Sequence, residues 1–131
     1  MRPQPLICVS DVAASSRWYA RLLGGRGDHE GPEYCRVYFG DAFVLQLHSF
    51  EDDHHHGPIG DPADRPYGNG ALLWFETDDF EAAMRRIAAL NPPLVMPRHR
   101  NPNAGHWECW VRDPDGYVVV IASPDGSAPE A

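Results

Sequence analysis

The same order of secondary-structure signals occurs twice along this chain, and that repetition limits the folds it can adopt. Apolar residues recur at helical spacing in 12–23 and again from Asp78 to about Leu90. Each helical stretch follows one strand signal and precedes others, so each half is predicted to be βαβββ. Positions in the two helices correspond at a constant offset: Val12, Ala14, Arg17, Tyr19 and Leu22 match Phe80, Ala82, Arg85, Ile87 and Leu90. A half this short cannot bury both its helix and its sheet, so we expect an α+β fold of two paired modules.

The clearest strand pair is predicted in 110–121, where Pro114 and Gly116 favour a tight turn between aromatic and β-branched flanks. The expected organisation is a single domain over 1–125 with a flexible tail over 124–131. Within the domain we expect a first module at 1–50, a loop at 51–68 and a second module at 69–123. The other predicted strands are 4–9, 33–39, 42–49, 70–76 and a short one at 94–96.

Composition excludes several classes of function. The formal net charge of −8 argues against nucleic-acid binding, which needs clustered cations. All 11 Lys-or-Arg positions are arginine, so no lysine is present to form a Schiff base. No stretch is apolar enough to cross a membrane, and residues 1–5 lack a signal-peptide core, so we expect a cytoplasmic protein. The bias toward arginine, proline and alanine suggests a bacterial source. The cysteines lack paired metal-ligand spacing and are expected to be small buried residues: Cys8, Cys35 and Cys109.

Three motifs in a fixed order connect the chain to a known family. They are Val9-Ser10-Asp11 with Ser16, Trp18-Tyr19 and Leu22-Leu23-Gly24, then Phe75-Glu76-Thr77-Asp78-Asp79-Phe80-Glu81-Ala82-Ala83, then Arg112-Asp113-Pro114-Asp115-Gly116-Tyr117. Together they resemble the vicinal oxygen chelate superfamily, which includes glyoxalase I, extradiol dioxygenases, fosfomycin-resistance enzymes and bleomycin-resistance proteins. The resemblance implies a glyoxalase/bleomycin-resistance-like fold, in which the two modules form a curved mixed sheet around a cleft. It also implies a homodimer, with modules paired within or between chains.

The resemblance also locates the positions at which the family's enzymes hold a metal ion. In this chain they are Gln4, Gln46, Leu72 and Val120. Divalent metals prefer carboxylate, imidazole or thiolate ligands, and the side chains of Leu72 and Val120 donate nothing. We therefore expect the usual metal site to be absent. This favours the bleomycin-resistance type of member, which holds a ligand without metal.

Strand alternation predicts which residues lie beside these four positions. The candidate ligand-binding residues are Gln4, Leu6, Gln46, His48, Leu72, Trp74, His106, Glu108, Trp110 and Val120. Such an aromatic wall with a few polar groups suits a small, flat organic molecule that stacks on indole rings. The alternative is that the tryptophans are core residues, since large aromatic side chains commonly fill the interface between a sheet and a helix. The placement of Trp74 and Trp110 also depends on the register, because a slip of one residue would turn both to the other face.

Two further functions stay open. His48, His106 and Glu108 form the ligand set of many mononuclear metal sites, so a displaced divalent metal could serve a lyase, isomerase or dioxygenase. No catalytic residue is assigned and no cofactor is firmly expected. The other possibility is a cleft retained by descent in a protein-interaction module. The run His54-His55-His56 belongs to a loop for which a lid or packing role, ligation by one histidine, and an incidental surface position all stay open.

Overall fold

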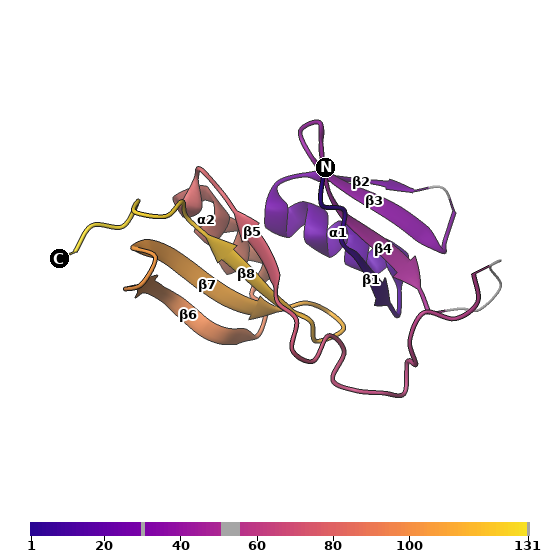
Figure 1. Ribbon diagram of the computed structural model, residues 1–131. Helices are drawn as coiled ribbons and strands as arrows, with labels where there is room; N and C mark the ends of the chain where they lie inside the picture. The colour runs from indigo at the N-terminus through magenta and orange to yellow at the C-terminus, as the bar shows by residue number, and fades with distance from the viewer. Residues whose placement is uncertain (30, 51–55, 131) are drawn as a thin grey trace. The chain divides into compact units, whose positions relative to one another are not determined.

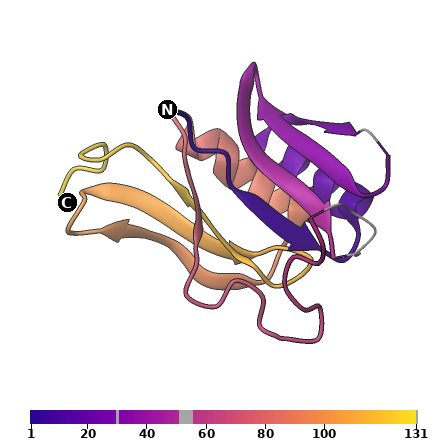
Figure 2. The same ribbon diagram turned by 45° about the vertical axis from the view of Figure 1, so that its right-hand side comes forward.

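The computed structural model describes residues 1–29, 31–50 and 56–130. The chain divides into two compact units, Met1–Tyr67 and Gly68–Ala131. In the described residues, each unit has one helix and one four-stranded sheet, and Figures 1 and 2 show the helix against one face of its own sheet. The α+β class and the two βαβββ units predicted from the repeated pattern are confirmed.

The first unit is built around a sheet of strand order β1-β4-β3-β2, in which β1 runs parallel to β4. Its elements are β1 (Leu6–Val9), α1 (Val12–Leu23), β2 (Arg26–His29), β3 (Tyr34–Phe39) and β4 (Ala42–Ser49). The Asp11 carboxylate caps α1 by accepting a hydrogen bond of 3.0 Å from the Ala14 N–H. The helix ends at Gly24, whose φ of 68° lies in the left-handed region that glycine favours.

The βαβββ plan requires a strand at this point, but its position at Arg26–His29 was not predicted, because these residues are polar or glycine and follow directly on the end of the helix. The structure explains the glycine at position 27 by close packing. A Cβ atom there would lie 2.0 Å from the Ser16 Oγ atom of α1 and 3.2 Å from Cys35 Sγ. A residue without a side chain therefore lets β2 approach the helix closely.

The second unit repeats this plan in a sheet of strand order β5-β8-β7-β6. Its elements are β5 (Leu73–Glu76), α2 (Phe80–Leu90), β6 (Leu94–Asn101), β7 (His106–Arg112) and β8 (Val118–Ala122). The helix begins at Phe80 and is capped by Asp79, whereas the sequence predicted a helical stretch from Asp78. Strand β6 extends to Asn101, well beyond the short strand predicted at 94–96.

The turn between β7 and β8 is closed by a buried aspartate. Asp113 Oδ1 accepts hydrogen bonds from the backbone N–H groups of Asp115 and Tyr117, at 2.8 and 2.9 Å. Gly116 has a φ of 92°, as the turn prediction required. This local motif forms the hairpin that carries most of the candidate site.

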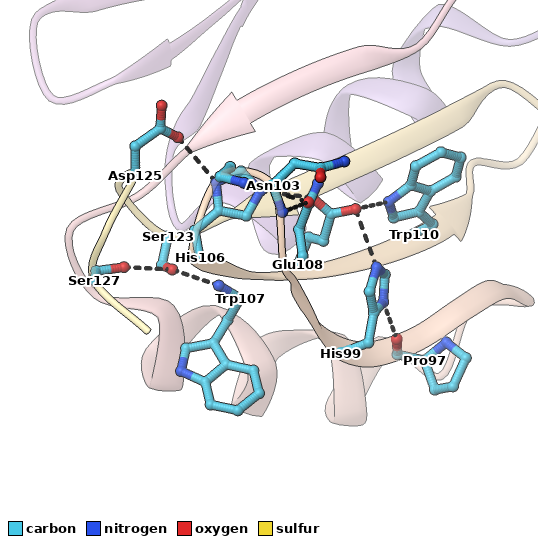
Figure 3. Close-up of polar contacts among 12 residues, drawn as sticks. Pro97, His99, Asn103, His106, Trp107, Glu108, Trp110, Ser123, Asp125 and Ser127 are labelled. Carbon is cyan, nitrogen blue, oxygen red and sulfur yellow. Dashed lines mark hydrogen bonds and ion pairs between the residues drawn. The ribbon is translucent and has the colours of Figure 1, made fainter. Parts of the chain in front are cut away.

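The two faces of the second sheet are chemically different. Arg98 of β6 lies over the rings of Phe80 in α2 and of Trp107, which places Trp107 on the helix side. Because side chains alternate along a strand, Glu108 and Trp110 point away from α2, as Figure 3 shows. We call this side of the second sheet, with Trp74, Val120, Trp110 and Glu108, the distal face. No helix in the described part of the chain is long and apolar enough to span a membrane.

Candidate functional site

A buried carboxylate, Glu108, lies at the centre of the distal face. Its side chain is only 3% exposed, and both of its oxygens are hydrogen-bonded (Figure 3). In the described residues its contacts are His99 Nε2 (3.1 Å) and Trp110 Nε1 (2.9 Å) at Oε1, and Asn101 Nδ2 (3.2 Å) and His106 Nε2 (2.6 Å) at Oε2. A carboxylate has about four lone-pair positions, so these contacts use its accepting capacity. To bind a metal ion in this arrangement, Glu108 would have to give up one of these bonds.

His106 lies between two carboxylates. Its Nε2 atom is 2.6 Å from Glu108 and its Nδ1 atom is 3.0 Å from Asp125 Oδ1. Both contacts are hydrogen bonds at once only when both ring nitrogens carry protons. Burial lowers the pKa of His106, but the hydrogen bonds to Glu108 and Asp125 outweigh it and raise that pKa overall.

The ionisation of Glu108 is shifted in the opposite direction. Burial raises the pKa of its carboxyl group, but the hydrogen bonds from His106, Trp110, Asn101 and His99 together lower it below its usual value. Both shifts favour the imidazolium form of His106 and the carboxylate form of Glu108. Their strong, charge-assisted contacts hold both side chains in one orientation.

Two indoles flank this polar network. Trp74 of β5, Val120 of β8 and Trp110 of β7 are register partners across neighbouring strands, so they share the distal face. The Trp110 N–H is bound to Glu108, and the Trp74 ring lies 5.9 Å from that of His106. Val120 is buried between its neighbours, whereas 46% of Trp74 is exposed. Trp74 is therefore an aromatic surface available for stacking.

The predicted site residues of the first unit are held by contacts within that unit. Gln46 accepts a hydrogen bond of 2.5 Å from the Tyr34 hydroxyl and donates one of 2.9 Å to the backbone oxygen of Gln4. Leu6 is the register partner of Gln46 on β1 and is partly exposed. His48 is buried and donates from Nδ1 to the Ser49 carbonyl at 2.7 Å, with ring contacts to Tyr34 and His56. The amide of Gln46 thus connects β4 to β3 and to the N-terminal segment.

Within the second unit, the structure brings five of the predicted residues to one face of the sheet. His106, Glu108, Trp110, Trp74 and Val120 lie on one face of the second unit. Leu72, just before β5, is partly exposed. His48, the third member of the alternative metal set, belongs to the first unit. Among the residues that the structure describes, no group of three or more His, Cys, Asp or Glu side chains is arranged to hold a metal ion. His54 and His55 lie outside the described residues.

Three residues of the Glu108 network were missed from the sequence: His99, Asn101 and Asp125. His99 and Asn101 are register partners of Glu108 and His106 on β6. Extending that strand beyond Met96 in the prediction would have placed both histidine and asparagine opposite the site. No local signal indicates Asp125, because its contact with His106 depends on the path of the chain after β8.

Comparisons with known proteins agree with this architecture. Residues 3–121 match the family described as the Glyoxalase/Bleomycin resistance protein/Dioxygenase superfamily. A search of curated protein sequences gives no match. Similar solved structures include a lactoylglutathione lyase from Agrobacterium tumefaciens, at 20% identity over 94% of this chain and 92% of that one, with a TM-score of 0.70.

Two others are a glyoxalase-related enzyme from Fulvimarina pelagi (22% identity, 100% and 98% of the two chains, TM-score 0.71) and TioX from Micromonospora sp. ML1 (15%, 94% and 98%, TM-score 0.74). At such identities the likeness supports the fold alone. The family match covers most of the chain and confirms the resemblance carried by the three sequence motifs. The chain therefore belongs to the Glyoxalase/Bleomycin resistance protein/Dioxygenase superfamily.

Proposed function

We propose that this protein binds a small aromatic organic molecule on the distal face, without the metal ion used by the family's enzymes. The observation that carries the proposal is the position of Trp74. This large aromatic residue is nearly half exposed, yet it shares a strand row with Trp110 and contacts the ring of His106. A ring of the ligand would stack on this indole and remove its apolar surface from water.

The polar groups beside Trp74 are already hydrogen-bonded within the chain. We therefore expect the ligand to be recognised by stacking on the indole and not by new hydrogen bonds. Glu108 is engaged by four donors of the described chain, and the Asn101 side-chain oxygen accepts from the backbone N–H groups of Asn103 and Ala104 at 2.9 and 3.4 Å. The network therefore acts as a rigid support for the indoles. Preorganised aromatic surfaces bind with a smaller loss of side-chain entropy.

The residues at the family's metal positions support the same proposal. Leu72 and Val120 have no donor atoms, and both ends of the Gln46 amide are already hydrogen-bonded. The alternative of a metal site at a displaced position is also disfavoured, because Glu108 would have to exchange an existing hydrogen bond for a bond to the metal ion.

The test uses the four tryptophan indole N–H signals in a ¹H–¹⁵N spectrum, with quinoline and 2-naphthol as probes. Binding should shift the Trp74 and Trp110 signals in a saturable way. Trp74→Ala should weaken binding by about 1 kcal/mol, roughly fivefold in Kd. Phe39→Ala is the matched control, since Phe39 is an exposed aromatic residue of the first unit and its loss should leave Kd unchanged.

Metal analysis of the purified protein distinguishes a metal-free ligand-binding protein from a metal-dependent enzyme. Stoichiometric divalent metal that is lost in the His106→Ala, Glu108→Ala double variant would contradict the proposal and favour a metal-dependent lyase, isomerase or dioxygenase. If the probes shift no indole signal at millimolar concentration, the aromatic-ligand proposal fails and a protein-interaction role gains support.

A further inference from the structure

The C-terminal segment 123–128 makes defined contacts with the rest of the second unit. We propose that it is a positioning element of the ligand site, and that Asp125 holds His106 and thereby sets the orientation of Glu108 and the two indoles. This inference rests on the proposed function for its effect on ligand affinity. The positioning itself is a property of the ligand-free protein.

The segment is anchored by contacts that do not involve Asp125. The Gly126 and Ala128 N–H groups donate to the carbonyl oxygens of Ala104 and Gly105, at 2.9 and 2.8 Å, in the turn between β6 and β7. Arg100 Nε donates to the Ala128 carbonyl at 2.9 Å, and Ala128 is buried. The region expected to be a flexible tail therefore has its own backbone contacts, and its mobility in solution stays a prediction.

Serine side chains fix the start of the segment. Ser123 Oγ accepts a hydrogen bond of 2.8 Å from the Trp107 N–H and another of 2.7 Å from the Ser127 hydroxyl (Figure 3). The chain between Ser123 and Ser127 is thus closed into a short loop. Asp125 lies in this loop, and the loop brings its carboxylate to His106.

A continuous chain of polar contacts connects this loop to the indole. Asp125 Oδ1 faces His106 Nδ1 at 3.0 Å, His106 Nε2 contacts Glu108 at 2.6 Å, and Glu108 accepts from Trp110 Nε1 at 2.9 Å. The His106 ring also lies beside the exposed indole of Trp74. A second acceptor on Nδ1 fixes the rotation of the imidazole, which the bond to Glu108 alone does not do.

Asp125 is suited to experiment because its own burial contributes little. Its side chain is 82% exposed, whereas that of His106 is 5% exposed. Removing the carboxylate should therefore leave the fold intact while releasing one side of the imidazole. Asp125→Asn keeps an oxygen that can accept the Nδ1 proton, so it separates the hydrogen bond from the charge. Asp125→Glu is the conservative variant, and Glu130→Gln is a control for loss of an exposed carboxylate in the same tail.

The first measurement is made without ligand, on the full chain. Asp125→Ala should move the His106 ring ¹⁵N signals and the Trp110 indole N–H signal, Asp125→Glu should restore them, and Glu130→Gln should leave them unchanged. The second measurement is quinoline affinity, which Asp125→Ala should weaken by about threefold to tenfold.

Unchanged His106 and Trp110 signals in Asp125→Ala would overturn the inference. If these signals move and wild-type protein binds neither quinoline nor 2-naphthol, the positioning role stands and the proposed function alone fails. If wild-type protein binds quinoline and Asp125→Ala binds it equally, the proposed function stands and the segment has no part in it.

Discussion

At the scale of single residues, the second unit is organised by one buried acid. Glu108 has little contact with water and is stabilised by donors from two strands, His99 and Asn101 on β6 and His106 and Trp110 on β7. Such a group is costly to bury and strongly destabilising when its partners no longer match it. Glu108→Gln replaces one accepting oxygen with an NH₂ group that faces donors.

Glu108→Gln should lower the free energy of unfolding by about 3 kcal/mol, measured by urea denaturation. Glu76→Gln is the matched control. Glu76 pairs with Ala122, which in turn pairs with Glu108, so the two glutamates lie in one row across the sheet, but Glu76 is exposed. Its effect should stay within about 0.5 kcal/mol. Equal losses in the two variants would contradict a special role for the buried carboxylate.

The His106–Glu108 pair also predicts a pH dependence of stability. The pKa of His106 is raised in the folded protein, so protonation of this residue stabilises the fold. The stabilisation is fully present at a pH below the unfolded-state pKa of about 6.5, and it is lost as the pH rises through the folded-state pKa. The pKa of Glu108 is lowered in the folded protein, so its ionised form stabilises the fold at a pH above the unfolded-state pKa of about 4.3. This stabilisation is lost as the pH falls through the folded-state pKa of Glu108. The contribution of the pair should therefore be largest between about pH 4.5 and 6.5.

Urea unfolding at a series of pH values tests this window. In wild-type protein, the free energy of unfolding should decline as the pH rises above about 6.5. The decline should be smaller in His106→Gln, which cannot titrate. A decline of the same size in both proteins would assign it to other groups.

At the scale of elements, close approach of β2 to α1 depends on a missing side chain. Gly27 needs no unusual backbone angle, but a Cβ atom would meet Ser16 Oγ at 2.0 Å. Gly27→Ala should destabilise the protein by about 1–3 kcal/mol, because overpacking forces neighbouring atoms to move. Thermal or urea unfolding measures the loss.

The same contact supplies the control for this variant. Ser16→Ala removes the oxygen that the new methyl group would strike, so Gly27→Ala should cost less in a Ser16→Ala background than alone. A double-mutant cycle gives the coupling between the two positions. Strictly additive effects would place the cause of the destabilisation elsewhere.

At the scale of the whole molecule, the family resemblance predicts a homodimer. Strand β6 is an edge strand of its sheet and exposes three consecutive apolar residues, Leu94, Val95 and Met96. Exposed apolar edges favour association with another chain. Sedimentation equilibrium should give about twice the 14.6 kDa mass of one chain, and Val95→Glu should shift the equilibrium toward the monomer. A wild-type monomer at micromolar concentration would contradict this prediction.

Local patterns in the sequence were enough to determine the repeated plan. Helix α1 has the predicted bounds, Asp11 caps it, and Asp113 and Gly116 form the expected turn. These features depend on neighbours a few residues apart, where periodicity and capping act directly. The period of two along strands likewise placed Trp74, Trp110 and Glu108 on one face.

Only the tertiary structure decided how these side chains are held. His99 and Asn101 reach Glu108 because β6 is longer than its sequence predicted, and Asp125 reaches His106 from 19 positions away along the chain. Strand β2 can lie close to α1 because Gly27 leaves room for the Ser16 side chain. Each of these depends on the distance and register between elements, which arise from packing and have no local signature in the sequence.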